Sequence, residues 1–192
     1  MNGKIQRLAL MSLCAALTVV GTYIRLPVPG LTMIFTAQVY VVLLTGLLLG
    51  PKDGFMAMLA YILLGLCGFP VFSKGGGLHT LATPEGGFLL GFLASTLVCG
   101  FLRSTGIVRQ TLAALLGVLA MHAVALCYIA AQFALMGAPI GAAVLIQSYS
   151  LAFLPLDLLK GVGAALTVRA LQRALPGMFG KRASAARRPV QP

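Results

Sequence analysis

Residues 111–156 read TLAALLGVLAMHAVALCYIAAQFALMGAPIGAAVLIQSYSLAFLPL and include no Asp, Glu, Lys or Arg. A helix that crosses about 30 Å of membrane hydrocarbon needs about 20 mostly apolar residues. The stretch is too long for one such helix, and Gly137-Ala138-Pro139-Ile140-Gly141 interrupts it with residues that end helices. It therefore predicts two membrane helices, over residues 111–136 and 143–171.

Apolar segments of the same kind continue toward the N-terminus. Hydrophobic residues make up 59% of the chain and charged residues 9%, against about 45–50% and about 25% in soluble globular proteins. The three carboxylates, Asp53, Glu85 and Asp157, are too few for the mixed charges of a water-soluble surface. We therefore expect an all-α integral membrane protein with six transmembrane helices. The first four cover residues 5–24, 36–49, 55–69 and 83–102, and residues 50–54 are expected to form a turn.

The basic residues predict the orientation of this bundle in the membrane. With the N-terminus inside, eleven Lys and Arg side chains fall on the inner side and two, Arg25 and Lys74, on the outer side. This split follows the positive-inside rule, so both termini are expected in the cytoplasm. Residues 1–175 are expected to form one transmembrane domain and residues 176–192 a basic, disordered cytoplasmic tail. The inner cations are Lys4, Arg7, Lys52, Arg103, Arg109, Arg169, Arg173, Lys181, Arg182, Arg187 and Arg188.

Asp157 and Lys160 are the residues most able to carry chemistry inside the membrane. Their i, i+3 spacing places both side chains on one helix face. Asp157 lies about 18 Å from Arg169 along a helix, well inside the hydrocarbon, where a charged side chain is by default functional. Pro155 removes one helix hydrogen bond and lets the helix bend. We expect the pair to bind a ligand or ion, although an ion pair with a purely structural role remains the alternative.

Several functional classes do not match the chain. No nucleic-acid motif is present, and six of the fourteen basic residues follow residue 168, as in a tail that faces anionic lipid. A single deep carboxylate excludes an aspartyl protease, and no G-x-S-x-G or P-loop occurs. His79 and His122 stand in different segments without the supporting acids of a metal site, so His122 is expected to be a hydrogen-bonded packing residue. We expect neither an enzyme nor a resident metal or cofactor.

The loops on the outer side are unusually rich in groups that could meet a ligand. Thr36 and Gln38 at the top of the second helix offer donors and acceptors to a polar group. Gly75-Gly76-Gly77 precedes His79, and glycine runs let a backbone approach a ligand closely. Flexible loops in which the glycines merely turn the chain are the open alternative.

Five stretches of the chain, taken in order, resemble one family over about residues 5–172. The ordered set is what makes the resemblance specific, since each stretch alone is a common apolar string. They are Phe35-Thr36-Ala37-Gln38, Gly46-Leu47-Leu48-Leu49-Gly50-Pro51, Leu64-Gly65-Leu66-Cys67-Gly68-Phe69-Pro70-Val71-Phe72, Pro84-Glu85-Gly86-Gly87-Phe88-Leu89-Leu90-Gly91-Phe92 and Phe153-Leu154-Pro155-Leu156-Asp157-Leu158-Leu159-Lys160. The set resembles BioY, the biotin-specific substrate-binding subunit, or S component, of energy-coupling factor (ECF) transporters.

The resemblance implies an outward-facing biotin pocket. Asp157 and Lys160 match the family's Asp-x-x-Lys. Leu156 and Ala152 depart from the Gly and Pro usual beside this motif, and a Phe replaces the usual Tyr of a G-G-Tyr motif. The remaining residues implied in the pocket are Thr36 and Gln38 of a T-x-Q motif, Gly86, Gly87 and Phe88 of the G-G-Tyr position, the aromatic residues Phe35 and Tyr149, and His79 of the outer loop.

The resemblance also implies partners in the cell membrane. These are a transmembrane coupling protein and two cytoplasmic ATPases, which would hydrolyse the ATP that this chain cannot. The family docks through small residues on the first helix, and Ser12 and Ala16 offer that spacing, with Ala9 and Ala15 nearby. Ordinary packing of these small residues inside the bundle stays open. The alternative function is a self-sufficient, proton-coupled carrier for biotin or another small vitamin, with Asp157 as the proton site.

Overall fold

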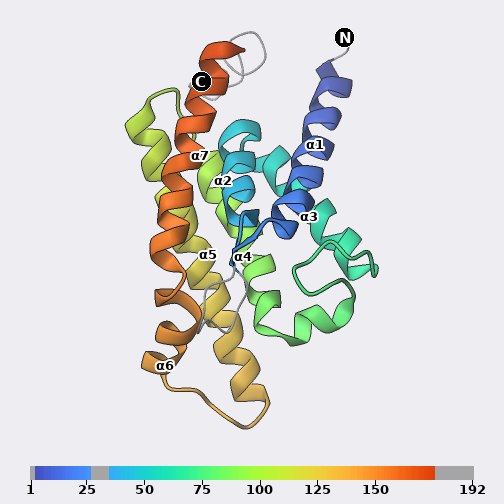
Figure 1. The fold of residues 1–192 in the computed structure, drawn as a ribbon, viewed down its shortest axis with the longest axis vertical. Helices are drawn as coiled ribbons and strands as arrows, with labels where there is room; N and C mark the ends of the chain where they lie inside the picture. The colour runs from blue at the N-terminus through green and yellow to red at the C-terminus, as the bar shows by residue number, and fades with distance from the viewer. Residues whose placement is uncertain (1–2, 27–34, 176–192) are drawn as a thin grey trace, which may run out of the picture.

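The structure is a computed structural model that describes residues 3–26 and 35–175, and the predicted tail at 176–192 lies outside the described residues. The described chain is a bundle of helices (Figure 1). The long helices are α1 (Gly3–Tyr23), α2 (Gln38–Leu49), α3 (Pro51–Leu66), α4 (Pro84–Phe101), α5 (Ile107–Leu135) and α7 (Leu154–Ala174). The short elements are the antiparallel strands β1 (Arg25–Leu26) and β2 (Phe35–Thr36), the 3-10 helix η1 (Leu78–Ala82), α6 (Ala142–Ile146) and the π-helix η2 (Gln147–Leu151).

Helix α2 occupies the centre of the bundle. It contacts α1, α3, α4, α5 and α7, and nearly all of its side chains are buried, from Gln38 at its start to Leu49 at its end. A helix that is apolar on every side is typical of a position surrounded by other helices. At 12 residues, α2 is about 18 Å long and falls short of the hydrocarbon thickness, but its neighbours shield it from lipid.

The prediction of a turn over residues 50–54 is wrong, because only Gly50 separates α2 from α3. Gly50 adopts φ 85°, a left-handed conformation that glycine tolerates and other residues rarely do. Pro51 then occupies the first turn of α3, where its missing N–H has no cost. Asp53 follows in the same turn and pairs with Arg7 of α1. Helix α3 therefore begins at Pro51, four residues before the predicted start.

The predicted helix over residues 143–171 is divided into three parts. Helix α6 and the π-helix η2 precede α7, and their direction differs from that of α7 by 42°. Pro155 lies in the first turn of α7, where it cannot donate to a preceding carbonyl. A π-helix inside a helical segment is rare and often accompanies a functional site. The bend expected from Pro155 is confirmed, and the single continuous helix is not.

Among the described residues, α1, α4 and α5 are each long and apolar enough to cross a membrane, and α6–η2 with α7 qualifies if the bent segment counts as one crossing. Helix α5 begins four residues before the predicted residue 111. Helices α2 and α3 are shorter than a full crossing. These apolar helices identify a membrane protein of mainly helical structure, and the count of six crossings stays a prediction.

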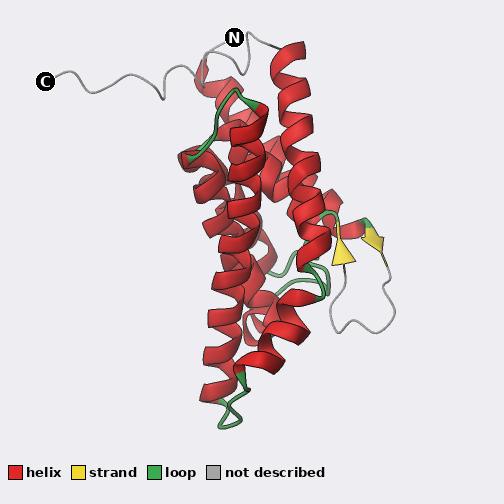
Figure 2. Ribbon diagram, turned by 90° about the vertical axis from the view of Figure 1, so that its left-hand side faces the viewer, coloured by secondary structure: helices red, strands yellow, loops and turns green. Residues whose placement is uncertain are grey.

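The two ends of the bundle differ in their elements. Helix α1 begins and α7 ends at the same end, the upper end in Figures 1 and 2. There Arg7 pairs with Asp53, Arg103 donates to the carbonyl of Leu49, and Arg169 donates to the carbonyl of Thr105. In the lower half of the figures lie β1, β2, η1 and the starts of α2, α4 and α7, and the end of α5 with α6 forms the lower tip.

Candidate ligand-binding site

The starts of α2, α4 and α7 meet around a cavity at the end of the bundle away from the start of α1. Its empty volume is about 540 Å³, including the part open to solvent. Six of the residues singled out in the sequence line it: Phe35, Thr36, Gln38, Phe88, Asp157 and Lys160. Leu89, Phe92 and Phe153 add apolar walls.

The backbone contributes an electrostatic preference to this cavity. A helix carries partial positive charge at its N-terminus, where several N–H groups have no carbonyl partner in the helix. The lining residues Gln38, Glu85 and Asp157 each lie in the first turn of α2, α4 or α7. Three positive helix ends therefore border one space, where they stabilise the carboxylates of Glu85 and Asp157.

Asp157 and Lys160 form a buried ion pair in the wall of the cavity. Lys160 Nζ lies 2.8 Å from Asp157 Oδ1, and the two side chains are 14% and 5% exposed. Nζ also lies 3.4 Å from the centre of the Phe35 ring, a cation–π contact that links α7 to β2. The predicted proximity of the two side chains is confirmed. The pair is close to the cavity rather than hidden behind it, so a ligand can reach both groups.

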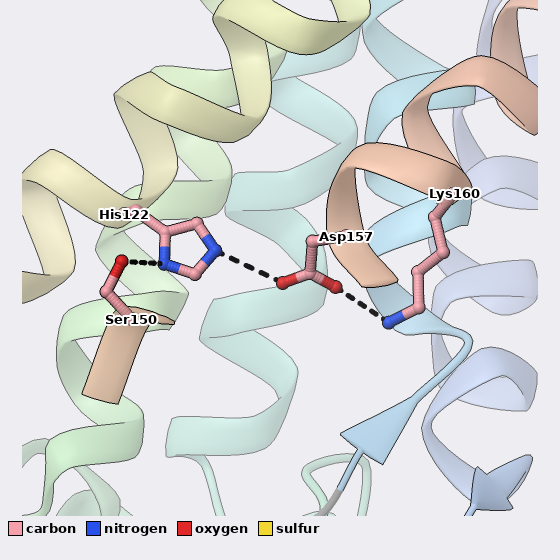
Figure 3. A network of polar contacts seen from close by, with 4 residues as sticks. All are labelled: His122, Ser150, Asp157 and Lys160. Carbon is pink, nitrogen blue, oxygen red and sulfur yellow. Dashed lines mark hydrogen bonds and ion pairs between the residues drawn. The ribbon is translucent and has the colours of Figure 1, made fainter. Parts of the chain in front are cut away.

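Asp157 has a second partner that the sequence did not identify. His122 Nε2 on α5 lies 3.2 Å from Asp157 Oδ2, and His122 Nδ1 lies 3.0 Å from Ser150 Oγ of η2 (Figure 3). His122 is hydrogen-bonded and buried, as expected, but its partner is the proposed ligand-binding carboxylate. The sequence held one signal of this contact. His122 precedes residue 136, the predicted end of its helix, by as many residues as Asp157 follows residue 143, the predicted start of the next helix. In a helical hairpin the two residues therefore lie at the same depth.

Gln38 is held in place by a short chain of hydrogen bonds. Its Nε2 donates to the hydroxyl of Tyr61 at 2.6 Å, and that hydroxyl donates to the carbonyl of Val71 at 3.0 Å. The Gln38 backbone N–H donates to Thr36 Oγ1 at 3.4 Å. The amide is therefore fixed by α3 and the loop that follows it, with its side chain against the cavity.

Glu85 and Ser73 also line the cavity, and neither was assigned to the site from the sequence. The Glu85 carboxylate accepts hydrogen bonds from the backbone N–H and the hydroxyl of Ser73. These bonds fasten the loop after α3 to the first turn of α4. The sequence supported only an interaction of Glu85 with the helix dipole, because nothing in it shows that residue 73 returns to this helix.

Four predicted site residues lie outside the cavity lining. A Cβ on Gly86 would meet Leu81 Cα at 2.9 Å, and one on Gly87 would meet the Ala125 carbonyl at 2.9 Å, so both allow close packing of α4. The Tyr149 ring lies 6.5 Å from that of Phe133, and His79 is exposed on η1. Contact of these residues with a ligand stays a prediction.

The small residues proposed for docking lie on α1. Ser12, Ala16 and Ala9 are exposed, whereas Ala15 is half-buried against the core. The exposed face of α1 is otherwise apolar and includes Leu13, which is 54% exposed. In a membrane protein such a face meets lipid or another helix.

Comparison with known proteins agrees with this architecture. The sequence model of the BioY family matches residues 1–177. The Probable biotin transporter BioY of Lysinibacillus sphaericus is 38% identical over 126 residues, 64% of this chain and 63% of that protein. The Biotin transporter BioY of Rhizobium etli is 34% identical over 165 residues, 79% of this chain and 81% of that protein.

The chain thus spans slightly less than two thirds of the Lysinibacillus relative. A solved structure, the crystal structure at 2.1 Å of the S-component for biotin from an ECF-type ABC transporter, shares the fold. It has a TM-score of 0.77 and 23% sequence identity, over 93% of this chain and 97% of that one. Because the family match runs through almost the whole chain and the fold agrees with it, this protein belongs to the BioY family.

Proposed function

We propose that the chain is the biotin-binding subunit of a vitamin uptake transporter, which captures biotin on the outer face and delivers it inward with an ATP-driven ECF module. The observation that carries this proposal is the cavity that holds the Asp157–Lys160 pair in a chain of the BioY family. The curated relatives are named as biotin transporters. ATP hydrolysis would take place in partner subunits, and the chain would need no cofactor of its own.

The chemistry of biotin matches the groups around the cavity. Biotin has a ureido ring with two N–H donors and one carbonyl acceptor, an apolar thioether ring and an anionic valerate tail. Asp157 would accept from a ureido N–H, and Phe35 and Phe88 would pack against the bicyclic body. Lys160 has two available partners, the ureido carbonyl and the valerate carboxylate. A biotin ester distinguishes them, because it keeps the first partner and removes the charge of the second.

The proposed topology has six crossings with both chain ends in the cytoplasm of a cell-membrane protein. Arg25 and Lys74 belong to the end with the cavity, which would be external, whereas many cations belong to the other end. This distribution is expected from the positive-inside rule. The cations of the cytoplasmic end, among described residues, are Lys4, Arg7, Lys52, Arg103, Arg109, Arg169 and Arg173.

Docking of the coupling protein is proposed on the exposed face of α1. Ser12 and Ala16 are one helical turn apart, so their small side chains form a shallow strip where another helix can approach closely. Ala9 extends this strip toward the cytoplasmic end, and Ala15 borders it. None of the residues of the strip lines the cavity, so docking and ligand binding would use separate surfaces.

Two experiments test the proposed function. Biotin is titrated into the purified, detergent-solubilised chain, where saturable binding is expected and its absence would refute the assignment of biotin. Uptake of labelled biotin is then measured in cells without biotin transporters of their own, with and without the coupling protein and ATPases. Equal uptake in both cells would favour a self-sufficient carrier over a subunit of an ECF transporter.

A further inference from the structure

Asp157 is held from two sides by side chains of different elements. Lys160 approaches Oδ1 from the same helix, and His122 approaches Oδ2 from α5 (Figure 3). Counted as whole residues, His122 and Asp157 are each 3% exposed and Ser150 is 5% exposed. The Phe88 ring stands edge-on to the imidazole, with 5.6 Å between ring centres. His122 therefore lies in a buried site with a neighbour on each side of its ring.

The hydrogen-bonding capacity of these groups determines the direction of each bond. An ionised carboxylate can only accept, so His122 Nε2 must carry the proton that it donates to Asp157. In the neutral imidazole Nδ1 then has a lone pair, and it accepts the hydroxyl proton of Ser150. Asp157 thus sets the tautomer of His122, and the Ser150 hydroxyl, which can donate or accept, completes the hydrogen bonding of the ring at Nδ1. In functional sites, a hydrogen bond at one ring nitrogen of a histidine commonly fixes the ring so that the other nitrogen can bind its partner.

The carboxylate needs this support because its own torsion is soft. The terminal torsion of Asp has broad, roughly two-fold preferences, so Lys160 alone would leave the carboxylate plane free to turn. Partners on both oxygens fix that plane and still leave lone pairs for another donor, since a carboxylate can accept about four hydrogen bonds. Fixing a binding group before the ligand arrives lowers the entropy lost on binding.

We infer that His122, held by Ser150 of the π-helix, is the positioning residue that orients Asp157 to accept N–H groups of the ligand. This inference rests on the proposed function, because the ligand with ureido N–H groups is biotin. His122 acts through Asp157 and does not itself line the cavity. The π-helix gains a role in binding, because it supplies the hydroxyl that holds the imidazole.

Two substitutions of His122 separate positioning from packing. The amide nitrogen of Gln reaches the place of Nε2, so His122→Gln keeps a donor for Asp157 and loses the contact with Ser150. The shorter His122→Asn keeps a group near Nδ1 and loses the contact with Asp157. Biotin titration should show affinity within about threefold of the parent for Gln, and a loss of about tenfold or more for Asn, the range of a hydrogen bond to a charged group. Equal losses, or parental affinity in His122→Asn, would overturn the inference.

A double-mutant cycle tests the route of the effect. In an Asp157→Ala background the carboxylate is gone, so His122→Asn should weaken biotin binding no further. A full additional tenfold loss would show that His122 acts independently of Asp157 and would overturn the inference. Thermal unfolding of each variant separates a loss of fold from a loss of affinity.

Ser150→Ala tests the chain of contacts with the smallest change in packing. It removes only the hydroxyl that holds Nδ1, and we expect a loss of about threefold, as in His122→Gln, because both variants lose this contact. Unchanged affinity would overturn the role of Ser150. If the parent chain does not bind biotin at all, the proposed function fails instead, so the two failures are distinguishable.

Discussion

Replacing Asp157 with Asn removes the charge that holds the polar cluster together and keeps the size of the side chain. In the parent, Lys160 Nζ lies 2.8 Å from Asp157 Oδ1. The amide oxygen of Asn can still accept from Lys160, and the amide nitrogen would then face His122. The imidazole can adapt by donating from Nδ1 to Ser150 and accepting at Nε2, because a histidine can exchange tautomers. Lys160 has no such alternative, and its ammonium group would remain buried without a counter-charge.

Lys160→Met is the complementary change. It keeps an apolar side chain of similar length, loses the cation–π contact with Phe35, and leaves the Asp157 carboxylate with His122 alone. Truncating one partner of a buried, hydrogen-bonded charge pair typically costs about 2–5 kcal/mol. Since about 1.4 kcal/mol is a tenfold change, each single substitution should weaken biotin binding by about 30-fold or more.

Isothermal titration of biotin into the detergent-solubilised chain measures these changes without partner subunits. The double variant, Asp157→Asn with Lys160→Met, should lose less than the product of the two single losses, because no unpaired charge remains. A biotin ester tests which group of biotin Lys160 binds. If Lys160 binds the valerate carboxylate, the ester should bind the parent weakly and lose little more in Lys160→Met. Near-parental affinity in both single variants would refute the Asp157–Lys160 pair as the biotin site.

Three further predictions concern topology, docking and packing. Reporters fused at residues 110 and 185 should be cytoplasmic and one at residue 76 external, and an external C-terminal reporter would contradict six crossings. Ser12→Leu or Ala16→Leu should prevent co-purification with the coupling protein but preserve biotin binding, whereas Ala131→Leu on the exposed face of α5 is the control that should affect neither. Gly100→Ala should lower stability by about 1–3 kcal/mol in thermal or denaturant unfolding, because its Cβ would meet Pro51 N at 2.3 Å. Gly141→Ala, with no atom within 4 Å of the added Cβ, should change little and is the control.

Much of the helical pattern could be predicted because lipid imposes it. In hydrocarbon every backbone group needs an internal partner, so long apolar segments have to be helical. The predicted segments around residues 83–102 and 111–136 accordingly match α4 and α5 closely. The start of α3 was missed although the sequence contains its signals, since a Pro in the first turn after a Gly is typical of a helix start. The rule that places Pro84 at the start of α4 applies equally to Pro51.

From spacing alone, the contacts of the candidate site could be predicted only where residues are close in sequence, whereas Phe35 and Phe88 are assigned to the pocket through the family resemblance. Asp157 and Lys160 are three residues apart, so helix geometry alone brings them together. His122 meets Asp157 across 35 positions, and Glu85 meets Ser73 through a loop whose path depends on packing. Contacts of this kind follow from how α5 packs against α7 and how the loop after α3 returns to α4. Helix lengths place His122 and Asp157 at one depth, but only the packing of the helices brings the two side chains into contact.

The break before α7 shows how backbone structure and charge support each other at this site. Because the helix restarts at Leu154, with Pro155 in its first turn, Asp157 lies in a first turn instead of in mid-helix. Its backbone N–H donates to the Phe153 carbonyl at 3.0 Å, which is one hydrogen bond at the start of α7. A carboxylate in this position is stabilised by the positive end of the helix dipole. An uninterrupted helix would place the same carboxylate in apolar surroundings, with only Lys160 on its own helix to compensate the charge. The restart of α7 thus places a carboxylate acceptor at the positive end of a helix beside the cavity, and η2, which precedes the restart, supplies Ser150 to the imidazole that contacts it.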